Sequence, residues 1–79
     1  MAPKLPVLSG REVRKLLLSL GFKEIGQSGS HLKFERAEPP PFRTVIVAMH
    51  PEVTPGTLMS ILRHAGIKRK DLELLLRRR

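Results

Sequence analysis

The chain has 79 residues and no cysteine, which allows one compact domain and excludes a disulfide framework or a thiolate metal site. No apolar run approaches the roughly 20 residues that span a bilayer, and the N-terminus lacks the long apolar stretch of a secretion signal, so we expect a cytoplasmic protein with no membrane partner. Fifteen Lys and Arg against seven Asp and Glu give a formal net charge of +8, which favours nucleic acid as the first candidate partner and an acidic protein as the second.

An extended lead is expected over residues 1–8, before the first helix. Ser9 and Glu12 have the spacing of a capping box, which places the start of a helix directly after Ser9. Apolar residues then recur at i, i+3, i+4 and i+7, the spacing of one helical face, at Val13, Leu16, Leu17 and Leu20. Gly21 follows where a left-handed residue commonly ends a helix, so the first helix is predicted to end there.

Two strands joined by a tight turn are expected next. Residues 22–27 and 31–35 flank a Ser-Gly turn signal at 28–29, which is typical of a hairpin. The second run alternates polar and apolar residues, and successive side chains of a strand point to opposite faces. His31 and Lys33 are therefore predicted on the open face of a sheet, and the apolar residues between and after them on the face that meets the helices.

A loop is expected over 37–42, because its three consecutive prolines cannot donate hydrogen bonds to a ladder. Residues 44–49 are rich in β-branched side chains and form the clearest predicted strand. Residues 54–66 have the pattern of a capped helix, from an N-cap threonine to a terminating glycine, and a short helix over 69–76 leaves 77–79 as a frayed basic tail. This order predicts an α+β fold, with a three-stranded antiparallel sheet and helices packed on one face.

The sequence carries no common cofactor or metal motif. It contains no Walker loop, no dinucleotide-binding glycine pattern and no H-E-x-x-H, and its single aspartate argues against the clustered carboxylates of a two-metal nuclease. We therefore expect no metal and no small-molecule cofactor. The candidates for chemistry are the three histidines, and among them His64, near a helix end, is interpreted as structural or solvated.

His31 has the neighbours that a phosphate site needs. Gly29 lets a phosphate approach the backbone closely, Ser30 can donate a hydrogen bond to it, and Lys33 supplies positive charge from the same predicted face. His50 ends the third predicted strand, on the face that matches His31, and is a secondary candidate. From these residues alone, a solvated surface histidine stays as an alternative to a catalytic one.

Four segments of the chain form a recognisable pattern. They are Ser9-Gly10-Arg11-Glu12-Val13, Leu20-Gly21-Phe22, Gln27-Ser28-Gly29-Ser30-His31, and the segment 56–67 with the letters GTLMSILRHAGI. Together they resemble the HicA family of toxin–antitoxin ribonucleases, and the resemblance runs from about residue 9 to residue 76. Two features depart from the family: Gly26 and Gln27 lie where many members carry a basic residue, and the proline loop at 39–41 is longer and stiffer than usual.

The resemblance implies a double-stranded-RNA-binding-like α-β-β-β-α fold for a single domain over residues 1–79. It further implies the toxin of a type II toxin–antitoxin pair, a ribosome-independent endonuclease that cleaves mRNA. The histidine of the family's G-S-H motif, here His31, is implied to be catalytic. The implied partners are mRNA and a HicB-type antitoxin protein that covers the active-site face.

Metal-free cleavage of RNA needs a base for the 2′-hydroxyl proton, a cation for the charge that develops on the phosphate, and an acid for the leaving 5′-oxygen. We assign His31 to proton transfer and Lys33 to charge stabilisation, with His50 as a candidate for the second proton transfer. The predicted RNA contacts are Gly29, Ser30, Lys33 and Arg36.

Two other interpretations of the same residues stay open. A non-catalytic RNA-binding module would have the same fold and charge and would bind RNA without cutting it. A small interaction protein would bind one acidic partner tightly and RNA only loosely. Basic residues outside the motif either guide the RNA backbone or are merely solvated, and the salt dependence of binding separates the two; they are Arg11, Arg14, Lys15 and Arg36.

Overall fold

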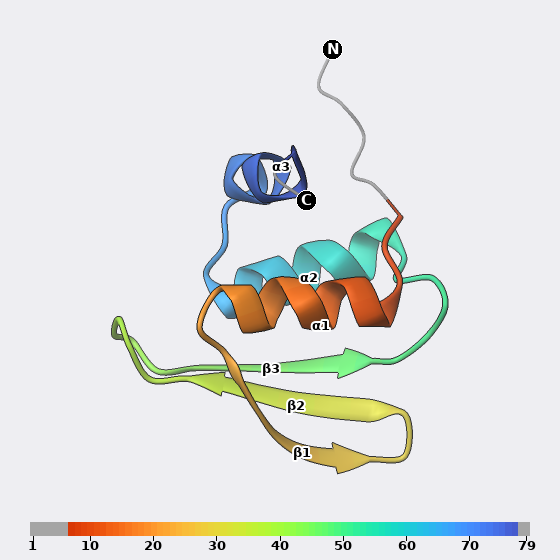
Figure 1. Ribbon diagram of the computed structural model, residues 1–79, viewed down its shortest axis with the longest axis horizontal. Helices are drawn as coiled ribbons and strands as arrows, with labels where there is room; N and C mark the ends of the chain where they lie inside the picture. Colours follow the sequence, from red (N-terminus) through yellow and green to blue (C-terminus); the bar gives the residue numbers. More distant parts are fainter. Residues whose placement is uncertain (1–6, 78–79) are drawn as a thin grey trace.

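The structure, a computed structural model, describes residues 7–77. In chain order its elements are helix α1 (Gly10–Ser19), strands β1 (Lys23–Ser28), β2 (His31–Arg36) and β3 (Arg43–Ala48), and helices α2 (Pro55–Ala65) and α3 (Arg69–Arg77). Figure 1 shows three layers: the sheet, then α1 and α2 over one of its faces, then α3 on the far side of these two helices. The predicted α+β fold, with an antiparallel sheet and helices on one face, is confirmed.

Helix α1 begins at the predicted capping box. The backbone N–H of Glu12 donates to Ser9 Oγ and the backbone N–H of Ser9 donates to Glu12 Oε1, each over 3.1 Å, so two N-terminal donors are satisfied reciprocally. The helix ends at Ser19, and Gly21 follows in the left-handed conformation with a φ of +90°. Its buried face carries Gly10, Val13, Leu16 and Leu17.

Helix α2 has the predicted caps at both ends. Thr54 Oγ1 accepts a hydrogen bond from the backbone N–H of Thr57, a proline occupies the first turn, and Gly66 ends the helix with a φ of +72°. Helix α3 follows after a short link and buries Leu72. No helix among the described residues is long and apolar enough to cross a membrane.

The sheet has the strand order β1-β2-β3, and both neighbouring pairs are antiparallel. His31 lies opposite Ser28 in β1 and opposite Ala48 in β3. The register of β1 shifts between Glu24 and Gly26, so Ile25 is the extra residue of a β-bulge. The sequence pattern did not predict this irregularity.

The core lies between the sheet and the helices. Its sheet side is formed by the inward residues of β2 and β3, which are Leu32, Phe34, Val45 and Val47. All four are buried, as the alternation of each strand predicts. Phe22 is also buried, as expected, whereas Phe42 is exposed in the loop before β3.

The end of the predicted N-terminal lead, at Leu8, differs from the expectation. Leu8 is buried in the core and forms an isolated antiparallel bridge with Val53, whose N–H donates to the Leu8 carbonyl over 2.6 Å. The predicted lead therefore ends in a structural contact. Residues 1–6 of the lead and residues 78–79 of the predicted tail lie outside the described residues, and Arg77 belongs to α3.

Candidate functional site

The turn between β1 and β2 presents the first two candidate phosphate ligands. Gly29 and Ser30 lie between the paired strand ends Ser28 and His31. Gly29 has a φ of +59°, a conformation that two-residue hairpin turns use at their first position and that glycine adopts without strain. A Cβ built on Gly29 would have no atom within 4 Å, so the backbone there is open to an approaching ligand.

His31 and Lys33 share the open face of the sheet. Both side chains are exposed, whereas the intervening Leu32 is buried against the helices. This burial pattern confirms the predicted common face of the two residues. Because two residues of a strand span about 6.6 Å, the imidazole and the ammonium group can reach the same phosphodiester.

A hollow of about 220 Å³ lies beside His31 on this face. Lys33 is the Cα partner of Gly26 in β1 and of Ile46 in β3, so these three residues form one row across the sheet. A Cβ built on Gly26 would have no atom within 4 Å, and the hollow is therefore open above this residue. It offers space for part of a nucleotide next to the imidazole.

The electrostatics at this end of the molecule favour an anion. Figure 1 shows that α1 and α2 both begin at the end where the β1–β2 turn lies, and a helix N-terminus carries partial positive charge. Lys33 adds a full charge on the open face. Within residues 7–77, no group of three or more His, Asp or Glu side chains is placed to hold a metal ion.

Arg36 does not join this group. It ends β2 about 16 Å along the strand from His31, and its Nη1 donates to the Leu20 carbonyl over 3.2 Å. Its Cζ lies 4.7 Å from the centroid of the Phe22 ring. The guanidinium thus caps the C-terminal end of α1 and stacks on a core aromatic ring. These contacts give Arg36 a structural role, and its contact with RNA stays a prediction.

Arg43 has the equivalent position at α2. It is the cross-strand partner of Arg36, and a Cβ built on Gly66 would overlap its guanidinium, so Arg43 lies against the C-cap of that helix. Two cations therefore face each other at the end of the sheet remote from His31. The negative ends of two helix dipoles offset their repulsion.

His50 lies beyond the end of β3. Its N–H turns back to the Ala48 carbonyl over 2.9 Å, and its own carbonyl accepts from the Gly10 N–H over 2.9 Å. The alternation that predicted a shared face for His50 and His31 therefore stops at Ala48. The second proton transfer by His50 stays a prediction, which the strand alternation no longer supports.

The basic residues of α1 divide into two kinds. Arg14 Nε lies 2.9 Å from Glu24 Oε1, and this ion pair joins α1 to β1. Arg11 and Lys15 are exposed on the same helix. The charge of Arg14 is therefore partly used inside the molecule, whereas the other two are available to a polyanion.

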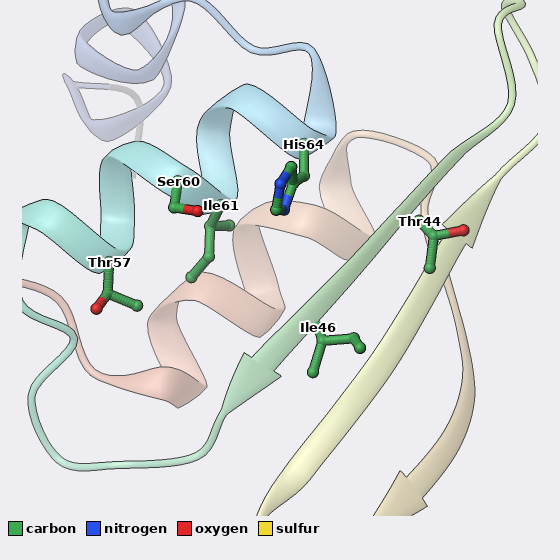
Figure 2. A pocket seen from close by; sticks show the side chains of 6 residues that line it. All are labelled: Thr44, Ile46, Thr57, Ser60, Ile61 and His64. Atoms are coloured by element: carbon green, nitrogen blue, oxygen red, sulfur yellow. The ribbon is translucent and has the colours of Figure 1, made fainter.

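A second depression, which the sequence did not predict, lies between β3 and α2 (Figure 2). This β3–α2 groove has a volume of about 360 Å³ and is lined by Thr44, Ile46, Thr57, Ser60, Ile61 and His64. His64, interpreted from the sequence as structural or solvated, thus belongs to a concave surface. No local sequence signal could have found the groove, because its two walls come from segments that only the tertiary fold brings together.

The sequence of the chain matches a known protein family. A family model described as the HicA toxin of bacterial toxin–antitoxin systems matches residues 10–67 of the 79-residue chain. The matched segment contains α1, the whole sheet with the Gly29–Ser30 turn, and α2. No curated protein and no solved structure matches the chain.

Proposed function

The chain belongs to the HicA toxin family of bacterial toxin–antitoxin systems, and from this membership we propose that it is a metal-independent endoribonuclease that cleaves mRNA in the cytoplasm. The observation that carries the proposal is the grouping of Gly29, Ser30, His31 and Lys33 at one end of an open sheet face, beside a hollow of about 220 Å³. The proposed protein partner is a HicB-type antitoxin that covers this face.

His31 performs proton transfer in the proposed reaction. RNA supplies its own nucleophile, the 2′-hydroxyl, whose oxygen forms a bond to phosphorus while the bond from phosphorus to the 5′-oxygen breaks. His31 takes the proton from the 2′-hydroxyl or gives one to the leaving 5′-oxygen, and such transfers contribute about 10²–10⁴-fold in rate. The products are a 2′,3′-cyclic phosphate and a 5′-hydroxyl. The other transfer falls to His50 or to water.

The neighbours of His31 hold the phosphate. Lys33 stabilises the negative charge that develops on its oxygens, and the Ser30 hydroxyl donates a hydrogen bond to one of them. The open backbone at Gly29 lets the phosphate approach closely. Two of the three phenylalanines are buried, so we expect recognition of backbone and shape rather than stacking on exposed bases.

The test is cleavage of a long unstructured RNA by purified protein in EDTA, with wild type compared with His31→Ala. His31 is exposed, so its replacement leaves the fold intact, which a thermal melt checks. We expect wild type to leave cyclic phosphate ends and His31→Ala to cut at least about 10²-fold more slowly. Equal cutting by both proteins would place catalysis on another residue or on a contaminant.

Two further outcomes decide between the remaining alternatives. RNA binding by wild type without any cutting would favour a non-catalytic RNA-binding module. Weak, salt-sensitive RNA binding together with tight binding of one acidic protein would favour an interaction protein.

The cleavage assay also tests His50. A lower cleavage rate in His50→Ala would make His50 the second proton-transfer group, and an unchanged rate would leave that step to water.

A further inference from the structure

The outer edge of β3, on the side away from β2, has no role in the proposed RNA cleavage. Among the described residues, β3 pairs with β2 alone. The N–H of Met49 donates to the Ser30 carbonyl over 2.7 Å, and hydrogen bonding alternates along an antiparallel strand, so the odd-numbered residues of β3 bond toward β2. Thr44 and Ile46 therefore direct their main-chain N–H and C=O groups away from the sheet.

The β3–α2 groove surrounds this edge. Thr44 and Ile46 line it from the open side of the sheet, whereas Thr57, Ser60 and His64 line it from α2 (Figure 2). The three helical residues follow the spacing i, i+3, i+7 and so form one stripe of α2. Because the two walls stand on opposite faces of the sheet, the free main-chain edge forms the floor between them.

We propose that an extended, acidic segment of another protein binds in the β3–α2 groove by adding a fourth strand to the sheet. The segment's main chain pairs with the free N–H and C=O groups of Thr44 and Ile46. Its side chains alternate between the hydroxyl- and imidazole-bearing wall of α2 and the open-face wall at Ile46. The main-chain pairs supply affinity, and the two walls supply specificity.

The charge around the groove favours an acidic occupant. None of its six lining residues carries a carboxylate. Two cations lie beside the groove. Arg43 is next to Thr44 and lies against the C-cap of α2, and Lys33 is the cross-strand partner of Ile46. Within the described part of the chain, the only carboxylate paired with these strand positions is that of Glu35, the cross-strand partner of Thr44. The net charge of +8 attracts an acidic segment and opposes a second copy of this chain at the same edge.

The chemistry of the edge also favours a peptide over RNA. Phosphate oxygens only accept hydrogen bonds, and the 2′-hydroxyl and base donors of RNA do not recur at strand spacing. A peptide supplies alternating donors and acceptors at the spacing of the outward N–H and C=O groups of Thr44 and Ile46. The inference does not depend on catalysis by His31. Peptide binding and RNA cleavage are measured separately, so either proposal can fail while the other stands.

The experiment is a nuclear magnetic resonance titration of the ¹⁵N-labelled full chain with a capped ten-residue peptide of alternating Glu and Val. We expect shift changes centred on the amides of Thr44, Ile46 and the groove face of α2, and at least tenfold slower hydrogen exchange at Thr44 and Ile46. A Lys-Val peptide of equal length and a Glu-Val peptide with a central proline should have no such effect, because the first has the wrong charge and the second lacks a main-chain donor.

A matched pair of variants tests the groove itself. Ser60→Glu places a carboxylate in the wall and should weaken the Glu-Val peptide at least tenfold. Met59→Glu makes the same charge change one residue away on α2, outside the lining residues, and should change affinity less than twofold. The proposal would be overturned if both variants weakened peptide binding equally, or if the shift changes were confined to the His31 face. If Ser60→Glu misfolds, the titration of the wild-type protein still tests the proposal.

Two outcomes would assign the edge to another occupant and so also overturn the proposal. If exchange at Thr44 and Ile46 slows with protein concentration in the absence of peptide, a second copy of the chain covers the edge. If a short 2′-O-methyl RNA shifts the groove residues and displaces the peptide, the groove belongs to the RNA path.

Discussion

Replacing Arg36 by alanine tests whether this residue supports the fold or contacts RNA, the role predicted for it from the sequence. The structure places its guanidinium 3.2 Å from the Leu20 carbonyl and 4.7 Å from the centre of the Phe22 ring. We therefore expect Arg36→Ala to lower the free energy of unfolding and to leave RNA binding by the folded protein unchanged. The matched variant is Lys33→Ala, in the same strand, for which we expect the opposite pattern.

The size of the stability loss follows from these contacts. A hydrogen bond from a charged donor contributes about 1.5–3 kcal/mol, with the lower end appropriate to a half-buried site, and the cation–π contact adds about 0.5–1 kcal/mol. Repulsion from the facing Arg43 and the buried, unpaired Nε of Arg36 offset part of this sum. The net loss is about 1 kcal/mol, which lowers the melting temperature of a domain of this size by roughly 4–8 °C.

The assay pairs thermal unfolding with RNA binding below the melting temperature of both variants. Binding uses 2′-O-methyl RNA, which lacks the nucleophilic hydroxyl, at several salt concentrations. Lys33→Ala should melt like wild type, because Lys33 is exposed, and should reduce the slope of log affinity against log salt by about 0.7–0.9. Arg36→Lys should destabilise less than Arg36→Ala, because lysine keeps the charge but not the planar stacking group.

Unchanged melting of Arg36→Ala, together with a reduced salt slope, would refute this reasoning. It would mean that the guanidinium leaves the end of α1 to bind phosphate. Loss of both properties would show that Arg36 serves both roles.

Three further predictions concern glycines and the last helix. A Cβ on Gly10 would lie 2.7 Å from the main-chain Cα of Met49, so Gly10→Ala should lower the free energy of unfolding by about 1–3 kcal/mol. A Cβ on Gly56 would have no atom within 4 Å, so Gly56→Ala should raise the free energy of unfolding by about 0.4–1 kcal/mol. Denaturant unfolding measures both, and equal effects of the two variants would contradict the packing at α1. Gly26→Lys, beside the hollow, should tighten RNA binding and steepen its salt slope by about 0.7–0.9, and an unchanged slope would show that RNA does not pass over the hollow. Leu72→Ala should cost about 2–5 kcal/mol, because Leu72 is the buried anchor of α3, and a smaller loss would show that α3 contributes little to the core.

The sequence alone determined most of the local structure. Ser9 with Glu12, and Thr54 with Gly66, marked helix ends that the structure confirms within a residue or two, because caps are decided by neighbouring residues. The strict alternation around Leu32 also placed its polar neighbours on the open face, since a strand has a side-chain period of two. The four segments that include the motif at His31 together indicated the family, which the match over residues 10–67 confirms.

Only the tertiary structure decided which of these residues meet. It turned Arg36 to the end of α1 and ended the strand before His50, and it drew Leu8 into the core. It also created the β3–α2 groove from segments that the sequence keeps apart. Local patterns specify caps, turns and faces because those depend on residues a few positions away, whereas helix-end capping by a distant arginine and a groove at a sheet edge depend on how the finished elements pack.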